Sequence, residues 1–227
     1  MVAPETHPGL AGLVLLAVQG PEYAAVRWGI AGRWPVVPMP LGARALADWW
    51  TKYQGQLQGR PVVLLGLAGA LTPGGSVGMR VVCQSCRLHP GGETRRCDPE
   101  LTQWLAQQLD APIVQSLTTQ RIVTQPQEKQ QLGERFDCAV VEMEGYELLG
   151  YLPRLGMVRV VSDGMTQPLP DLNAAMTPAT GQINLLRLGQ VMVQQPQAAW
   201  MLVHQGWRSI TELTAVARRL TVNPENN

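Results

Sequence analysis

The stretch AVVEMEGYELL (Ala139–Leu149) indicates the fold of this chain. It begins as an apolar run typical of a buried strand and ends in two carboxylates one residue apart, before a glycine and a short helical segment. Ligands in open α/β sheets bind outside the carboxyl ends of strands, so Glu142 and Glu144 are placed where such sheets carry their chemistry. Because side chains alternate along a strand, both glutamates are expected on one face and Met143 on the other, if the strand extends that far. A pair of solvated glutamates at a strand–helix junction explains this stretch alone equally well.

Carboxylates also follow two other predicted strands. The apolar run Leu10–Val18 predicts a buried strand, with Glu22 just beyond its end. The run Met157–Val161 predicts another, which ends in Ser162-Asp163. A further strand at 61–65 leads into Gly66–Leu71, which we predict to be a glycine-rich turn whose backbone N–H groups could approach an anion. The sequence therefore predicts that three acidic side chains, Glu22, Glu144 and Asp163, meet around one cavity.

Strands alternate with helices along the rest of the chain. A further strand is expected at 77–83, followed by a polar loop up to residue 96, and another strand at 112–117. Helices are expected at 43–57, 98–109 and 127–133. No repeat or linker is visible, so we predict one domain over residues 1–227. Its architecture is expected to be a three-layer α/β/α sandwich around a central mixed, mostly parallel sheet. Residues from about 178 to 227 are expected to be its helical C-terminal part, with a break at Gln195-Pro196 and a capping box at Ser209–Glu212.

Composition excludes several classes of function. With 45% hydrophobic and 15% charged residues among 227, the chain can bury a sizeable core. A net charge of +1 gives no indication of a nucleic-acid partner or an anionic membrane surface. The apolar run Leu10–Val18 is much shorter than the ~20 residues of a membrane helix, and it lacks the flanks of a signal peptide. We therefore expect a soluble, cytoplasmic protein with no membrane span.

The cysteines raise the question of a metal. Cys83, Cys86, His89 and Cys97 could supply the Cys₃His set that zinc accepts, but their spacing matches no standard zinc ribbon. Reduced, partly buried thiols are the preferred interpretation, so we predict no metal site. Cys138, within a predicted strand, is expected in the core. The tryptophans of helix 43–57, Trp49 and Trp50, are expected in the core or in a subunit contact.

Three segments together resemble the purine nucleoside phosphorylase and methylthioadenosine/adenosylhomocysteine nucleosidase superfamily. The segment Gly66–Gly78 resembles the family's Gly-x-Ala-Gly-Gly-Leu … Val-Gly-Asp, Val141–Gly145 resembles Val-Glu-Met-Glu-Ala, and Arg159–Asp163 resembles Arg-x-Ile-Ser-Asp. They occur in the family's order and at about its spacing, and the likeness covers roughly residues 10 to 190. Leu169-Pro170 and the tail containing Pro196 are most similar to the hopanoid-associated phosphorylase branch. The resemblance implies a nucleoside phosphorylase-like fold and a homo-oligomer.

The resemblance also implies a reaction, cleavage of the N-glycosidic bond of a purine-type nucleoside. Such a bond breaks through an oxocarbenium-like transition state while negative charge builds on the departing base. The family pattern places Asp163 at the base, where it would deliver or share a proton, and Glu144 on the ribose hydroxyls with Met143 against the sugar. It places Arg159 near the nucleophile or in a position to orient a carboxylate. Glu22 matches the water-activating glutamate of the nucleosidases. The remaining residues expected to bind substrate are Glu142, Ser162, Leu67, Ala68 and Gly69.

Departures from the family pattern keep other interpretations open. Leu67 stands where many members carry Ser or Thr, Met79 follows Gly78 where Asp is common, and the first turn lacks an arginine that holds phosphate in some phosphorylases. Phosphorolysis, with inorganic phosphate as co-substrate, and hydrolysis are therefore both open, and no other cofactor is expected. A nucleoside-binding or regulatory module with weak or no turnover is the main alternative. A scaffold acting through partner contacts is a third, suggested by seven tryptophans against one phenylalanine.

Overall fold

A computed structural model describes residues 10–175, 189, 193–194 and 196–221. The strands are β1 (Val14–Val18), β2 (Val36–Met39), β3 (Val62–Ala70), β4 (Arg80–Leu88), β5 (Thr94–Arg96), β6 (Ile113–Thr118), β7 (Val140–Glu142) and β8 (Leu155–Asp163). The helices are α1 (Pro21–Ile30), α2 (Leu46–Leu57) after a short 3-10 turn η2 (Ala43–Ala45), α3 (Pro99–Leu109), α4 (Pro126–Phe136), α5 (Gly145–Tyr151), α6 (Leu172–Ala175) and α8 (Pro196–Thr221). The mixed α/β architecture is the predicted one.

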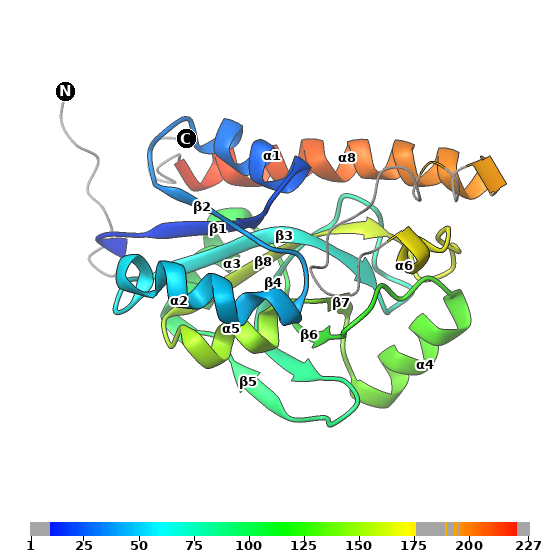
Figure 1. The fold of residues 1–227 in the computed structure, drawn as a ribbon, viewed down its shortest axis with the longest axis horizontal. Helices are drawn as coiled ribbons and strands as arrows, with labels where there is room; N and C mark the ends of the chain where they lie inside the picture. The colour runs from blue at the N-terminus through cyan, green and yellow to red at the C-terminus, as the bar shows by residue number, and fades with distance from the viewer. Residues whose placement is uncertain (1–9, 176–188, 190–192, 195, 222–227) are drawn as a thin grey trace.

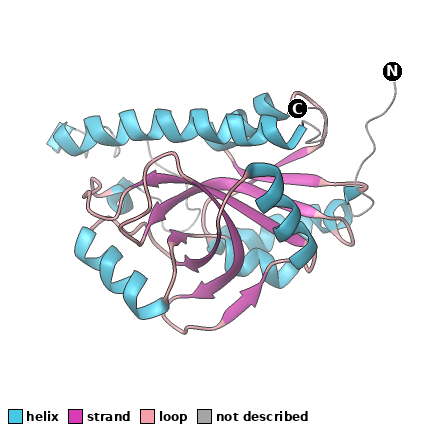
Figure 2. Cartoon of the chain, turned by 180° about the vertical axis from the view of Figure 1, so that it is seen from behind, coloured by secondary structure: helices cyan, strands magenta, loops and turns pink. Residues whose placement is uncertain are grey.

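The sheet is mixed and mostly parallel, and part of it closes on itself. Parallel pairs join β1 to β2 and β3, β3 to β8, β4 to β6 and β6 to β7. Antiparallel pairs join β8 to β4 and β4 to β5. A two-residue antiparallel contact then joins Gly69 and Ala70 of β3 to Val141 and Val140 of β7. The strands β3, β8, β4, β6 and β7 therefore form a ring, seen as the curled sheet in Figure 2.

Helices cover both faces of this sheet (Figure 1). One buried cluster joins α1, α3 and α8 to the strands, and a second joins α2 and α5 to the opposite face. A smaller cluster beneath α4 contains Leu132 and Phe136. The three predicted layers are therefore present. The predicted C-terminal helical part lies partly outside the described residues, as does Gln195 of the predicted break; within them, α8 is one helix that begins at Pro196.

The predicted glycine-rich turn is wrong, because β3 continues through Leu67, Ala68 and Gly69 to Ala70. Its glycines serve close packing. Gly66 is in register with Arg159 and Gly69 with Asp163 of β8. A Cβ atom at Gly66 would fall on Arg159 Nη1, and one at Gly69 would lie 2.9 Å from Asp163 Oδ2. Glycine inside a strand often marks such a close approach, and here it makes room for two charged side chains.

Two other local predictions also fail. The polar loop predicted up to residue 96 is instead the second half of β4, which pairs with β5. The predicted capping box at Ser209 lies inside α8, where the hydroxyl donates to the carbonyl oxygens of Gln205 (2.8 Å) and Val161 (3.1 Å). By contrast, Asp98 does cap α3, since its carboxylate accepts a hydrogen bond from the Leu101 N–H at 2.9 Å. A hydroxyl can bond to the preceding turn within a helix, so the sequence signature alone did not locate the helix start.

Candidate active site

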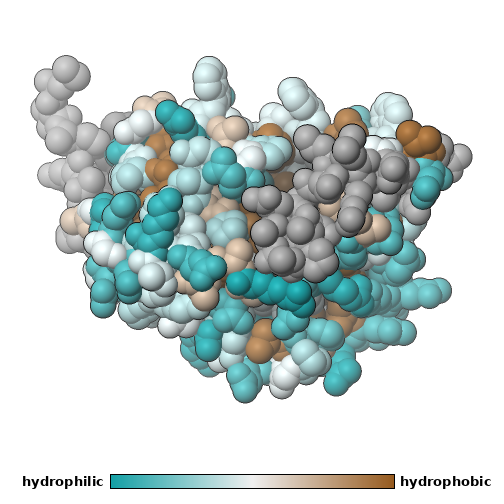
Figure 3. Space-filling model, in the orientation of Figure 1, coloured by the Kyte–Doolittle hydropathy of each residue, from teal (hydrophilic) through white to brown (hydrophobic). Residues whose placement is uncertain are grey.

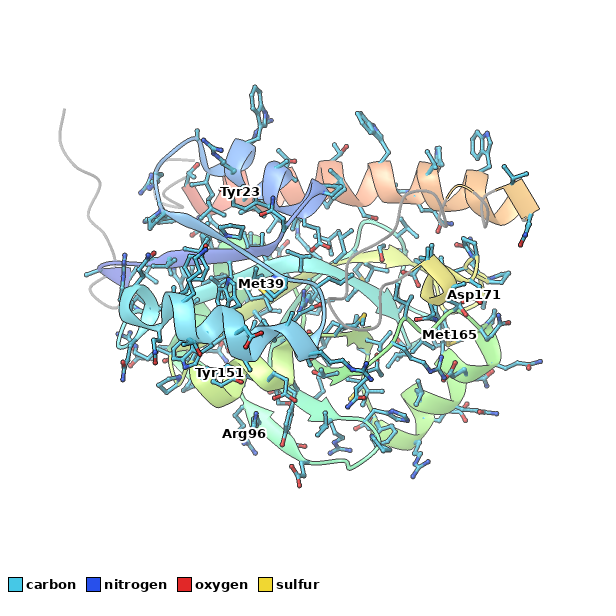
Figure 4. The ribbon with its side chains drawn as sticks, viewed as in Figure 1. Tyr23, Met39, Arg96, Tyr151, Met165 and Asp171 are labelled. Atoms are coloured by element: carbon cyan, nitrogen blue, oxygen red, sulfur yellow. The ribbon has the colours of Figure 1, made fainter. Side chains whose placement is uncertain are left out.

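A cavity of about 280 Å³ opens where β3, β7 and β8 end and α1 begins. It is lined by every residue that the sequence nominated for the site: Glu22, Leu67, Ala68, Gly69, Glu142, Met143, Glu144, Arg159, Ser162 and Asp163. Thr119, Arg121, Ile122, Val123, Leu169 and Leu172 form part of the remaining wall. In Figure 4, Met165 and Asp171 mark the segment between β8 and α6 that carries Leu169. The geometry therefore brings the predicted residues together, while their roles stay predictions.

Arg159 lies at the centre of the acidic cluster. Its guanidinium Nη2 donates to the carboxylates of Glu142 and Glu144, the latter at 3.3 Å. Arg159 Nη1 and Glu22 Oε2 both lie over Gly66, which has no side chain to separate them. Although burial disfavours the charged form, the surrounding carboxylates dominate and raise the pKa of Arg159. Arg159 therefore stays a cation, and its Nε–H has no acceptor within the described part of the chain.

Glu142 is held by donors on both carboxylate oxygens. One oxygen accepts from the Thr118 hydroxyl, and the other accepts from Arg159 and from the N–H groups of Glu144 (3.0 Å) and Gly145 (2.6 Å). Since β7 ends at Glu142, the expected alternation does not continue. Met143 lies in the same cavity as both glutamates, and its predicted position on the opposite face is wrong. Glu142 thus fixes Arg159 and the start of α5.

Glu144 and Glu22 each retain one strong backbone donor. The Glu144 carboxylate accepts from the Gly42 N–H at 2.9 Å, and that of Glu22 accepts from the Leu67 N–H at 3.0 Å. Burial raises the pKa of Glu144 to about 7, although Arg159 opposes the rise. Burial of its carboxyl group also raises the pKa of Glu22 above the ordinary range, again opposed by Arg159. For both carboxyl groups burial raises the pKa more than the Arg159 charge lowers it, so both hold a proton more tightly than free glutamate does.

Asp163 is paired with a lysine that the sequence analysis did not nominate. Its Oδ1 accepts from the Ser162 hydroxyl at 2.6 Å, and its Oδ2 forms an ion pair with Lys129 Nζ. Lys129 is completely buried and also donates to the Gly164 carbonyl oxygen at 3.0 Å. The sequence did carry a signal. Lys129 is spaced at i, i+3 and i+7 with Leu132 and Phe136 of α4, so helical periodicity places a lysine on the core face of that helix.

The rest of the cavity wall is apolar. Its members are aliphatic side chains from several segments: Val18, Leu41, Leu67, Ile122, Val123, Leu169 and Leu172. Arg121 also lines the cavity, but its guanidinium is paired with Glu128. The cavity therefore combines a charged floor on β3, β7 and β8 with a wall that suits uncharged groups.

The described residues contain no group of three His, Cys, Asp or Glu side chains that could hold a metal ion. Cys83, Cys86 and Cys97 are buried, and burial raises the pKa of the Cys83 and Cys86 thiols. His89 packs edge-on against the ring of Phe136, with the ring centroids 5.7 Å apart. The arrangement is that of core thiols.

Solved structures of several nucleosidases resemble this structure over nearly its whole length. No protein-family model and no curated protein sequence matches the chain. Futalosine hydrolase of Helicobacter pylori covers 92% of the chain, with 96% of its own length matched, at a TM-score of 0.66 and 12% identity. The 5′-methylthioadenosine/S-adenosylhomocysteine nucleosidase of the same organism covers 92% of the chain, with 97% of its own length matched, at a TM-score of 0.66 and 11% identity. S-adenosylhomocysteine nucleosidase of Streptococcus pyogenes covers 92% of the chain, with 98% of its own length matched, at a TM-score of 0.63 and 16% identity. The chain has the nucleosidase fold.

Within the nucleosidase fold, this chain carries its acidic residues at the carboxyl ends of strands, where α/β sheets bind ligands. The expected fold resemblance is therefore confirmed. The narrower prediction of a hopanoid-associated branch is not confirmed by these structures. At 11–16% identity the likeness establishes the fold, and the reaction has to be argued from the site itself.

Proposed function

We propose that this protein hydrolyses the N-glycosidic bond of a purine-type nucleoside. The observation that carries the proposal is the convergence of Glu22, Glu144 and Asp163 on one cavity, with Arg159 between the first two. Glycosidic cleavage builds positive charge on the sugar and negative charge on the leaving base. A cavity with clustered carboxylates on one side and an Asp–Lys pair on the other provides for both charges.

The roles follow from the chemistry of each group. The Glu144 carboxylate accepts hydrogen bonds from the ribose hydroxyls and stabilises the cationic sugar. Glu22 takes a proton from the attacking water, whose oxygen bonds to the anomeric carbon as the carbon–nitrogen bond breaks. The bonding electron pair leaves with the base, and Asp163 supplies the proton that the base takes up. Burial raises the pKa of Glu22, and a carboxylate with a raised pKa accepts a proton from water more readily than free glutamate does.

The charges in the cavity favour water over phosphate as the nucleophile. A phosphate anion needs several available N–H donors or a guanidinium fork. Arg159 already binds two carboxylates, and the Leu67 N–H is bound to Glu22. A doubly charged anion would also lie beside three carboxylates. These contacts support hydrolysis over phosphorolysis.

The apolar wall favours a nucleoside with an uncharged substituent over a nucleotide. Leu41, Ile122, Val123, Leu169 and Leu172 offer no donor to a phosphate group. The similar structures are those of a futalosine hydrolase and of a 5′-methylthioadenosine/S-adenosylhomocysteine nucleosidase. Because the wall is apolar, the substrate class that we propose is a nucleoside carrying an apolar group, as 5′-methylthioadenosine does.

A nucleoside-binding module without turnover is the second candidate. It is favoured by Leu67, an apolar side chain lining the cavity where many family members carry Ser or Thr. It is also favoured by the pairing of Asp163 with a buried lysine, because Lys129 already occupies one oxygen of the carboxylate that would have to meet the base.

Product analysis separates these possibilities. The purified protein is incubated with adenosine, inosine and 5′-methylthioadenosine, with and without phosphate, and free base, free sugar and sugar 1-phosphate are quantified. Hydrolysis predicts base and free sugar at a rate independent of phosphate, lost in Glu22→Gln and Asp163→Asn. Asp171→Asn, an exposed carboxylate outside the cavity lining, is the matched control. Sugar 1-phosphate would overturn the choice of water. A nucleoside that raises thermal stability without base release would select the binding module.

A further inference from the structure

The outer side of α1 and α8 exposes an unusual set of large apolar side chains. Trp28 of α1 is 73% exposed, and Trp200, Val203 and Trp207 of α8 are 69%, 62% and 77% exposed. We call these four residues the tryptophan face. The core tryptophan Trp49, in contrast, is 8% exposed. Indole rings held in water on an ordered helix require an explanation, because clustered exposed apolar groups usually mark a binding surface.

The tryptophan face runs along the outer side of two helices that pack against each other. Trp200, Val203 and Trp207 follow helical spacing, so they lie along one side of α8. The other side of α8 is buried through Leu213, Val216, Ala217 and Leu220. The helix α1 lies alongside (Figure 1) and touches α8 at Gly29, where a Cβ atom would be 2.6 Å from the Thr214 carbonyl oxygen. Trp28, the neighbour of Gly29 in the sequence, therefore lies next to α8.

The charges around the tryptophan face are all of one sign. The exposed charged residues of α1 and α8 are arginines: Arg27, Arg208, Arg218 and Arg219. The acidic residues of these helices are engaged elsewhere, since Glu22 lines the cavity and Glu212 pairs with Arg80 at 3.4 Å. In Figure 3 most of the strongly hydrophilic surface lies away from α1 and α8. The face is thus apolar with a basic border.

Two of these arginines line a hollow at one end of the face. An open depression of about 1020 Å³ is bordered by Arg27 and Arg218 together with Tyr23, Trp28 and Trp34. Among the described residues, neither guanidinium group makes a side-chain hydrogen bond or an ion pair. A guanidinium fork matches the geometry of a phosphate group, and an adjacent indole tolerates the boundary between water and hydrocarbon. The hollow therefore suits a phospholipid headgroup.

We propose that the tryptophan face docks this protein on the surface of an anionic phospholipid bilayer. Amphipathic helices with tryptophan on one face and arginine beside it lie in the headgroup region in this way. No helix among the described residues is long and apolar enough to cross a membrane, so the contact is peripheral. A second copy of the chain is a poorer occupant. A two-fold interface sets a surface against a copy of itself, and among the described residues of α1 and α8 both acidic side chains are already engaged, so the copy would offer the arginines no free acidic partner.

The face is close to the candidate active site yet independent of the proposed reaction. Gly206 of α8 lines the cavity, and Trp207 is its neighbour on the outer side of the same helix. A docked bilayer would lie along the outside of the helix that contributes to the cavity wall. Bilayer binding is measured without any substrate, so its failure and the failure of the proposed hydrolysis are separate outcomes.

Vesicle co-sedimentation of the full chain tests the proposal. The expected result is binding to vesicles of equal phosphatidylcholine and phosphatidylserine, weaker binding to pure phosphatidylcholine, and release by salt. Arg27→Gln/Arg218→Gln should weaken partitioning about 30-fold, because each arginine near an anionic surface contributes about fivefold. Trp28→Gln/Trp207→Gln should weaken it about tenfold or more through lost apolar burial.

The matched control removes the same charge from another part of the surface. Arg96 and Arg135 are exposed residues of β5 and α4, and Figure 4 shows Arg96 on the side away from α1 and α8. Arg96→Gln/Arg135→Gln should leave vesicle binding within about twofold of wild type. An equal loss in this control, or no binding of wild type to anionic vesicles, overturns the proposal. So does a shift from dimer to monomer in the tryptophan variant by analytical ultracentrifugation, which would assign the face to a second copy.

Discussion

Gly66 of β3 lies opposite Arg159 of β8, and the guanidinium occupies the space that a side chain at position 66 would need. The same position would lie 2.7 Å from Glu22 Oε2. One missing side chain therefore lets an arginine from one strand meet a glutamate from the first helix.

The substitution Gly66→Ala should displace Arg159 and Glu22 from each other and lower kcat/KM by about 10²-fold, since misplacement by about 1 Å can cost that much. The measurement is steady-state kinetics on whichever nucleoside is cleaved. Gly74→Ala is the control, because a Cβ atom there meets nothing within 4 Å. An unchanged kcat/KM in Gly66→Ala would show that the contact between Arg159 and Glu22 has no part in catalysis.

The buried pair of Lys129 and Asp163 should be essential for stability. Lys129→Met leaves a nearly buried carboxylate without its cation, and breaking such a pair costs about 3–5 kcal/mol of unfolding free energy. Chemical denaturation measures the loss. Because the two residues act together, Lys129→Met/Asp163→Asn should be more stable than the sum of the single losses implies. Strict additivity would mean that the two side chains do not interact in solution.

The stability of the protein should fall between about pH 5 and pH 8. Burial raises the pKa of Glu144 from 4.5 to about 7. A carboxyl group whose pKa is raised in the folded state binds a proton more tightly there. Its stabilising contribution is complete below pH 4.5 and is lost as the pH rises through about 7. The loss corresponds to about 3 kcal/mol.

Denaturation across this pH range tests the assignment to Glu144. Glu144→Gln should flatten the decline, while Glu134→Gln, at an exposed position in α4, should leave it as in wild type. If the decline persists unchanged in Glu144→Gln, another group causes it.

The rate of base release should fall as the pH is lowered through the raised pKa of Glu22, because the proposed general base must be ionised to accept a proton from water. Glu22→Gln should lower kcat by about 10²–10⁴-fold and remove this acidic limb of the pH–rate profile. The profile of kcat is measured on wild type and variant. A limb that survives in Glu22→Gln would transfer the base role to another group, with Glu144 the first to examine.

The sequence predicted the layers of the fold because each buried strand is a continuous apolar run bounded by glycine, proline or charge. The runs that became β1, β3 and β8 are such segments, and Asp98-Pro99 located the start of α3 correctly. The conformation of two glycines was predicted wrongly. The sequence predicts a turn at Gly66 and Gly69, but both belong to β3, where the missing side chains leave room for Arg159 and Asp163. That reason is a contact between strands about 90 residues apart, and no local pattern contains it.

The sequence predicted which residues line the cavity, since carboxylates at strand ends collect at one edge of a sheet, while their roles stay predictions. Lys129 was missed because a helical lysine is usually solvated, and only its spacing with Leu132 and Phe136 indicates a buried position. The sequence also could not predict that both carboxylate oxygens of Glu142 already accept hydrogen bonds. This arrangement depends on Thr118 and on the N–H groups of Glu144 and Gly145, which meet only once β7 ends after three residues.

The division of the cavity between strands and connecting segments has a consequence for how this protein could change during evolution. Arg159, Asp163 and Glu142 belong to strands whose neighbours hold them on both sides, so altering any one of them disturbs the whole ring. Ile122, Val123, Leu169 and Leu172 belong to connections and to a four-residue helix that the sheet does not constrain. Substitutions in these outlying segments could therefore change which molecule is accepted, while the residues proposed to cleave the bond stay in place.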